Sequence, residues 1–172
     1  MPEGVRIDGL RRLGLSEALI RQSAGNCLHP LLEFRCAGPP YRSYHGAGCP
    51  EGPPLAPLWE CGDSVTGVWV REGRLEFIQF SIEDQKEYRV LARTEQGLWA
   101  TVFVNLYEDR DDLAPQAFRD AAGAVGFRFL DRLVASYGSG FPTFEAHEAF
   151  LSDLVGTIDG ESAEGPTFSP AP

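Results

Sequence analysis

The chain has 172 residues, of which 43% are hydrophobic and 23% charged, and its formal net charge is −10. This length and composition are typical of one globular domain with its own core. An acidic surface repels phosphate backbones, and no apolar run of about 18 residues occurs, so we expect neither nucleic-acid binding nor a membrane span. Because the N-terminus lacks a basic segment followed by an apolar one, we expect a cytoplasmic protein.

The charge is unevenly placed along the chain. Residues 1–44 hold six Arg and four acidic residues, whereas the remainder holds nine basic and 21 acidic residues. The acidic part is suited to attract a basic partner, although excess negative charge also serves solubility alone. The charge count leaves both interpretations open.

The first predicted helix runs from Leu10 to Ala24, where apolar residues recur at helical spacing. Ser16 is expected as an N-cap of this helix and Gly25 as its end. Residues 31–36 follow as a candidate short strand, although their hydrophobic alternation is poor.

Residues 37–57 are the clearest irregular segment, because Pro and Gly dominate them and prevent regular structure. A loop of this length in a compact domain is either a binding loop or a connector. Tyr41 and Tyr44 lie within it and are suited to contact a partner, since tyrosines bury area at low entropy cost. The alternative is that they only fix the loop to the body of the domain.

A block of strands comes next. Residues 57–61, 64–70 and 75–80 are rich in β-branched and aromatic side chains, and residues 71–74 form a tight turn between the last two. The alternation of apolar and polar residues predicts a half-buried antiparallel hairpin. Residues 88–92 are predicted as a further strand or a helical turn.

The strongest helical pattern lies in residues 96–107, where apolar residues fall at i, i+3, i+4 and i+7. Thr94 is expected to cap this helix, which we expect to cover one face of the sheet. Residues 117–125 predict a weaker helix that follows a Pro in its first turn and ends at Gly126.

The C-terminal part is predicted to be helical up to Gly156. Residues 127–135 form a helix or a strand–helix junction, and Thr143 caps a last helix that ends at Gly156. The polar segment 157–172 is expected to be a disordered tail. The sequence therefore predicts a single α+β domain over residues 1–156, with a central antiparallel or mixed sheet of roughly four to six strands covered by helices.

Motifs of known catalytic chemistry are absent from the sequence: it has no phosphate-binding loop, dinucleotide-binding glycine motif, zinc-protease motif or serine nucleophile elbow. Cys49 and His45 are the one candidate nucleophile–base pair, in a loop that offers little rigid support. A zinc site built from Cys27, His29, Cys36, His45 and Cys49 stays open, although structural zinc sites usually have two tight ligand pairs and only Cys27 and His29 form one here. We therefore expect a protein that is not an enzyme and holds no cofactor.

Acidic residues follow both the predicted sheet and the predicted helix. Glu83, Asp84 and Glu87 are expected to form an acidic rim beside Trp59 and Trp69. The run 108–112 lacks the ligand spacing of a calcium loop, so a hydrated helix end is favoured there. The candidate partner-binding residues are Tyr41, Tyr44, Glu60, Asp63, Trp69, Glu76, Glu83, Asp84, Glu87, Glu108, Asp109, Asp111 and Asp112.

Four short segments in this order carry a family resemblance: Pro57-Leu58-Trp59-Glu60, Thr66-Gly67-Val68-Trp69, Phe77-Ile78-Gln79-Phe80 and Leu91-Ala92-Arg93-Thr94, before a helix that runs to Glu108. Over residues 50–110 the chain resembles the SUKH superfamily, whose members include a yeast cell-wall-synthesis regulator and many bacterial immunity proteins. The resemblance implies a central sheet in a mixed α/β fold. It also implies a non-catalytic protein that binds and neutralises a toxin, often a nuclease.

We expect a protein partner, such as a basic toxin, and a monomer or weak homodimer. An acidic surface would complement a basic nuclease. Two alternatives remain open: a small enzyme that uses Cys49, His45 or the carboxylates, and a structural subunit of a larger assembly that docks through loop 37–57 and the tail.

Overall fold

The computed structural model describes residues 3–40, 49–109, 114–138 and 141–163. Two helices and a short 3₁₀ turn precede four strands, and four more helices follow. The elements are α1 (Glu3–Arg12), α2 (Glu17–Ser23), η1 (Pro30–Leu32), β1 (Ala56–Cys61), β2 (Ser64–Arg71), β3 (Arg74–Ser81), β4 (Tyr88–Ala92), α3 (Glu95–Asp109), α4 (Pro115–Val125), α5 (Leu130–Tyr137) and α6 (Phe144–Ala163).

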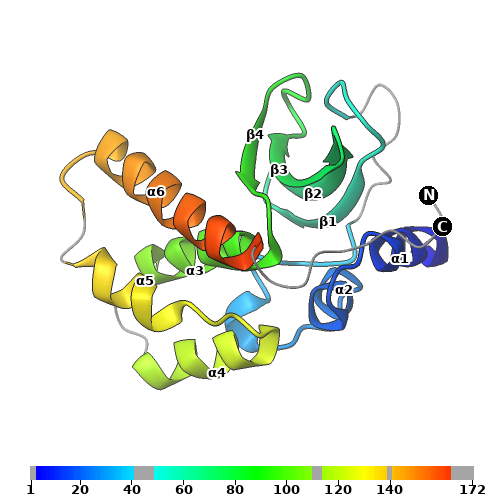
Figure 1. The fold of residues 1–172 in the computed structure, drawn as a ribbon. Coiled ribbons are helices and arrows are strands. Elements are labelled where there is room, and N and C mark those ends of the chain that lie inside the picture. Colours follow the sequence, from blue (N-terminus) through cyan, green and yellow to red (C-terminus); the bar gives the residue numbers. More distant parts are fainter. Residues whose placement is uncertain (1–2, 41–48, 110–113, 139–140, 164–172) are drawn as a thin grey trace.

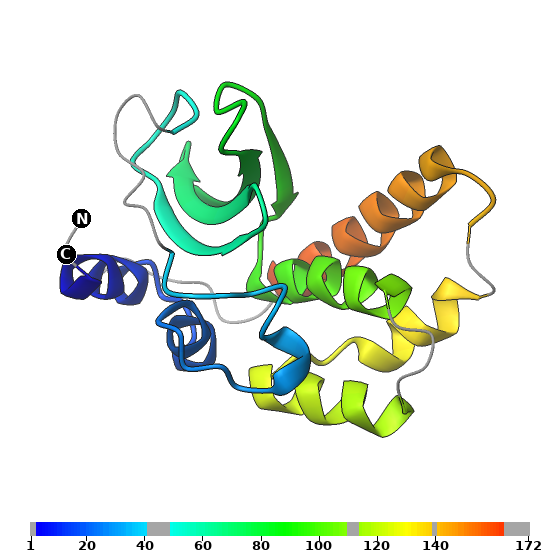
Figure 2. The same ribbon diagram turned by 180° about the vertical axis from the view of Figure 1, so that it is seen from behind.

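The four strands form one antiparallel sheet in the order β1-β2-β3-β4. The chain is therefore a single α+β domain with a four-stranded sheet, as the sequence predicts. Pairing is irregular between Pro57 and Trp59 and between Phe77 and Ile78. Because such bulges bend and twist a strand, they account for the strong curl of the sheet in Figures 1 and 2.

Alternation along β2 and β3 gives the sheet two apolar faces. Val68 pairs with Phe77, and both join the main core on the helix side. The next residues in the alternation, Trp69 and Ile78, point the other way into a second cluster with Leu55, Val65 and Phe80. The outer face of the sheet therefore has a small core of its own.

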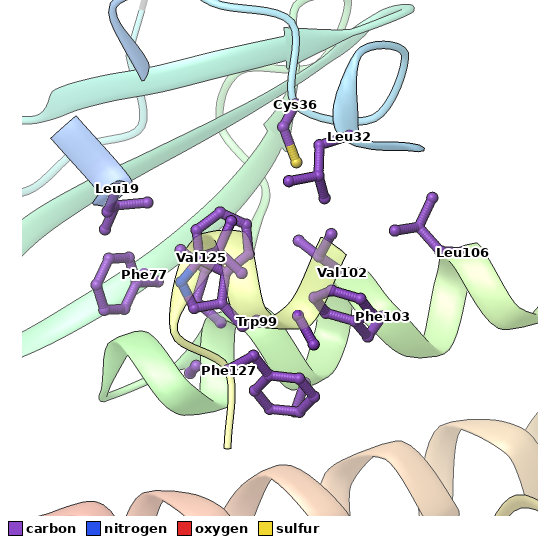
Figure 3. Close-up of a cluster of buried hydrophobic side chains, with 14 of the residues drawn as sticks. Leu19, Leu32, Cys36, Phe77, Trp99, Val102, Phe103, Leu106, Val125 and Phe127 are labelled. Carbon is purple, nitrogen blue, oxygen red and sulfur yellow. The ribbon is translucent and has the colours of Figure 1, made fainter. Parts of the chain in front are cut away.

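The main core is built around α3. Leu98, Trp99 and Phe103 of this helix have no exposed surface, and Trp99 stacks on Trp59 of β1 with ring centroids 5.8 Å apart. Figure 3 shows side chains from α2, η1, the sheet, α3 and α4 gathered in this cluster. Aromatic side chains of this size supply much of the buried apolar area of a domain.

Several predicted helix ends are confirmed by hydrogen bonds. The Oγ of Ser16 accepts from the backbone N–H of Leu19 at 3.2 Å, and Oγ1 of Thr94 accepts from that of Gly97 at 3.1 Å. Gly126 follows α4 with φ = 70°, a backbone conformation that favours glycine. These caps are local features, which explains why the sequence reveals them.

The predicted single helix over Leu10 to Ala24 is wrong. The chain instead forms α1 and α2, which are separated by a break at Gly14, where φ is 74°. The sequence pattern missed α1 because its buried positions are Leu10 and a charged residue, Arg6. The predicted strand over 31–36 is also wrong: η1 and turns occupy it, and the neighbouring Ala37 forms one isolated bridge with Glu60.

The predicted end of the domain at Gly156 is wrong as well. Helix α6 continues through Gly156 to Ala163, so the first residues of the expected tail are part of the fold. Ile158 is completely buried in the main core. Asp159 accepts hydrogen bonds from the backbone N–H groups of Arg93 and Thr94, at 2.7 and 2.9 Å. Tertiary contacts thus override the helix-breaking tendency of Gly156.

Candidate functional site

Some predicted site residues lie outside the described part of the chain. These are Tyr41, Tyr44, Asp111 and Asp112, together with His45 of the candidate catalytic pair. Asp109 is the last residue of α3. The remaining predicted residues fall in three separate places, so the structure does not bring them into one surface.

A group of exposed carboxylates lies at one end of the sheet, and we call it the acidic rim. It consists of Glu51, Asp63, Glu83, Asp84 and Glu87, all of which are exposed. The backbone N–H of Ile82 donates to the carbonyl of Asp63 at 2.8 Å, which ties the loop after β3 to the turn before β2. Glu51 was not among the predicted residues, because its place in the Pro- and Gly-rich segment gave no indication of its neighbours.

Local hydrogen bonds shape the loop that carries most of the acidic rim. The Oγ of Ser81 accepts from the backbone N–H of Glu83 at 3.1 Å. Oδ1 of Asp84 accepts from the backbone N–H of Lys86 at 3.3 Å. Turns of this kind, closed by a side chain on the backbone, hold a loop without burying its charges. The carboxylates are therefore presented to solvent from an ordered loop.

An open hollow of about 850 Å³ lies within the acidic rim. It is lined by Glu51, Glu83, Asp84 and Lys86 and by the less polar side chains of Cys49, Ile82 and Gln85. Cys49 and Ile82 pack against the second cluster on the outer face of the sheet. The hollow thus combines an apolar floor with acidic walls, a composition suited to contact a partner that is both apolar and cationic.

Trp69 lies beneath this surface and is not exposed on it. Its indole is 1% exposed, packs edge-on against Tyr88, and donates from Nε1 to Oε2 of Glu76 at 2.9 Å. Trp59 points into the main core on the opposite face of the sheet. An acidic rim beside both tryptophans is therefore excluded, and only Trp69 lies on the side of the hollow.

The other predicted carboxylates lie apart from the acidic rim. Glu60 is half-buried on β1, where its backbone N–H donates to the carbonyl of Ala37 at 3.2 Å. Glu108 is near the end of α3, where Oε1 lies 3.2 Å from Nε2 of His147 on α6. Glu108 is thus part of a second candidate site.

This second site is a groove between the helix side of β4 and the helices α3 and α6, and we call it the Arg89 groove. Three adjoining cavities of about 230, 350 and 550 Å³ make it up, and Arg89 lines each of them. Nε of Arg89 donates to Oε1 of Gln79 at 3.1 Å, and Nη1 lies 3.7 Å from Oε1 of Glu148. The guanidinium therefore stands at the junction of the three cavities.

Charged and aromatic side chains meet in the largest of these cavities. Its lining includes Glu108, His147 and Glu148 beside Tyr137, Phe141 and Phe144. His147 is only 12% exposed, and the rings of His147 and Phe141 are 5.5 Å apart. Sequence reasoning missed this site because its residues come from β4, α3, α5 and α6 and share no spacing pattern.

The cysteines give no support to a reactive thiol or a metal site. Burial raises the pKa of the Cys49 thiol, and burial also raises the pKa of Cys36, which lies in the main core. A raised pKa lowers the fraction of nucleophilic thiolate at neutral pH. Among the described residues, no three His, Cys, Asp or Glu side chains gather as metal ligands.

We predict a fixed order of alkylation in the native protein at pH 8. Exposed Cys27 should react with iodoacetamide first, Cys49 more slowly because burial raises its pKa, and Cys36 only after denaturant is added. Mass spectrometry of a time course measures the order. If Cys49 reacted fastest, an activated thiolate would be present and the enzyme alternative would gain support.

Within the ranges that the structure describes, no helix combines the length and the apolar character needed to cross a bilayer. Comparisons of the chain with protein-family models, with curated proteins and with solved structures gave no match.

Proposed function

We propose that the chain is a non-catalytic binding protein of the immunity type, and that its acidic rim binds a cationic surface of a protein toxin. The observation that supports this most is the acidic rim itself. Three of its exposed carboxylates, Glu51, Glu83 and Asp84, line an open hollow that has Lys86 as its basic lining residue. The resemblance to the SUKH superfamily suggests a nuclease as the toxin, since nucleases present basic surfaces to their substrates.

Electrostatics explains how such a surface would select its partner. A patch of one charge sign speeds the encounter with an oppositely charged protein by roughly 10–1,000-fold at low ionic strength. It also disfavours acidic competitors, because like charges brought together cost free energy. Since the rim charges are exposed, salt should screen them, and binding should weaken as ionic strength rises.

The apolar floor of the hollow supplies the second half of the proposed interface. Ile82 and Cys49 are partly buried and rest on the second cluster. Interfaces commonly combine an apolar centre with a polar border. A partner that places an apolar residue on this floor and basic residues on the acidic rim would match both features.

Reversal of three rim charges is expected to weaken partner capture strongly. The variant carries Glu51→Lys, Glu83→Lys and Asp84→Lys, and the measurement is a pull-down from cells of the source organism, followed by titration calorimetry with the captured protein. We expect association to slow by roughly 10–1,000-fold, because attraction becomes repulsion.

The matched control carries Asp120→Lys, Asp131→Lys and Asp153→Lys, which make the same change in net charge at exposed positions of α4, α5 and α6 (Figure 1) that do not line the hollow. This control should retain the partner. The proposal fails if both variants capture the same protein equally well, or if the unmodified chain yields no stoichiometric protein partner.

A further inference from the structure

The guanidinium of Arg89 is held in position in the groove. It has more N–H donors than hydrogen bonds within the described residues. Among the described residues, Arg89 makes one hydrogen bond, from Nε to Gln79, and its Nη1 is 3.7 Å from Glu148, beyond hydrogen-bond distance. Arg89 lines the groove with Nη1 in a loose ion pair with Glu148. The parallel N–H bonds of a guanidinium match the two oxygens of a carboxylate, which Arg binds in a bidentate manner.

Two carboxylates flank the imidazole of His147, and one of them, Glu148, also lies beside Arg89. Oε1 of Glu108 is 3.2 Å from Nε2 of His147, and Oε1 of Glu148 is 3.9 Å from Nδ1. Nε2 of His147 is buried, and apart from this close contact with Glu108 it has no hydrogen-bond partner among the described residues.

The charges of the groove restrict the class of ligand. A simple anion would approach Arg89 but would be repelled by Glu108 and Glu148. A simple cation would approach the two carboxylates but would be repelled by Arg89. A ligand that carries a carboxylate and an ammonium group a few ångströms apart satisfies both sides, as does the backbone of a free amino acid.

Aromatic rings form the remaining wall of the same cavity. Tyr137 and Phe141 pack edge to face, with centroids 5.2 Å apart. Phe144 lines the cavity and is 72% exposed, an uncommon position for a large apolar side chain. An apolar ring of a ligand would cover it and would stack on or against these residues. The cavity volume of about 550 Å³ is within the range of small-molecule sites.

We propose that the Arg89 groove is a binding site for a free α-amino acid with an aromatic side chain. The ligand carboxylate pairs with the guanidinium of Arg89, and its ammonium group lies beside the carboxylates of Glu108 and Glu148. Its ring packs on Tyr137, Phe141 and Phe144. Asp63 of the acidic rim lines the smallest of the three cavities, but no rim residue lines the cavity that holds the ligand, and the assignment does not depend on the proposed binding of a protein toxin.

Calorimetric titration of the full chain with L-phenylalanine tests this assignment. Phenylalanine should bind, whereas three analogues should each bind at least roughly tenfold more weakly, because each lacks one of the matched groups. The analogues are phenethylamine, which lacks the carboxylate, 3-phenylpropionate, which lacks the ammonium group, and alanine, which lacks the ring.

The Arg89→Gln variant should weaken phenylalanine binding by roughly tenfold to a hundredfold, through loss of a charge-assisted contact. Arg132→Gln is the matched control. Arg132 also pairs with a glutamate, Glu161, and it does not line the groove. It should bind phenylalanine as the unmodified chain does. Circular dichroism melts establish that both variants fold.

Three results would overturn the assignment. The first is no heat of binding with phenylalanine up to about 10 mM, a concentration that would reveal millimolar affinity. The second is equal affinity in folded Arg89→Gln protein. The third is binding of 3-phenylpropionate as tight as that of phenylalanine, which would indicate a plain anion site. None of these titrations uses a protein partner, so they are independent of the outcome for the acidic rim.

Discussion

A chain that ends at Gly156 is expected to lose its cooperative unfolding transition. The deletion removes Ile158, which is fully buried, and Asp159, which binds two backbone N–H groups at the start of α3. Loss of a buried Ile costs about 2–5 kcal/mol, and loss of hydrogen bonds to a charged group costs about 1.5–3 kcal/mol each. Together these amounts are comparable with the whole stability of a typical domain, about 5–15 kcal/mol.

The measurement is a urea titration followed by far-ultraviolet circular dichroism. A chain that ends at Ala163 is the control, because it retains all of α6, and it should unfold at the same urea concentration as the full chain. If the chain that ends at Gly156 unfolded with an unchanged midpoint, residues 157–163 would contribute nothing to the fold.

A single substitution separates the two contributions. Asp159→Ala should lower the free energy of unfolding by roughly 2–3 kcal/mol, because the N–H groups of Arg93 and Thr94 lose their acceptor. The hydroxyl of Thr94 also donates to Oδ1 of Asp159 at 2.6 Å. Asp153→Ala, at an exposed position of the same helix, should change this free energy by less than about 0.5 kcal/mol.

Those features of the fold that depend on neighbouring residues could be predicted from the sequence. The hairpin of β2 and β3 follows from alternating apolar residues and a Gly-containing turn, and the caps at Ser16 and Thr94 follow from their own hydroxyl groups. The same holds for the end of α4 at Gly126. In each case the residues that cause the structure are close together in the chain.

Features that depend on distant residues could not be predicted in this way. Gly156 has a low helix propensity, yet α6 continues because Ile158 and Asp159 find partners elsewhere in the fold. The two candidate sites show the same limit. Glu51 joins Glu83 only through tertiary structure, and the Arg89 groove draws its residues from four separate elements.

Helix α1 is the most instructive case, because a charged residue holds it to the domain. Arg6 is 3% exposed. Nη1 donates to the carbonyl of Pro57 and Nη2 to that of Ser23, both at 2.9 Å. Its Nε donates to the carboxylate of Glu3 at 2.9 Å. One side chain thus links α1, α2 and β1, whereas hydrophobic periodicity would assign an Arg to the surface.

Arg6→Met is therefore expected to destabilise the protein by about 3 kcal/mol. Met fills part of the space of the arginine stem but cannot donate, so the carbonyls of Ser23 and Pro57 stay buried without their donors. The midpoint of urea unfolding measures the loss. Arg12→Met is the control on the same helix. Arg12 is exposed, and within the described part of the chain its side chain donates one hydrogen bond, to the carbonyl of Asp8 in α1, so its loss should cost less than about 0.5 kcal/mol. Equal midpoints for the two variants would mean that the buried guanidinium does not hold α1 in place.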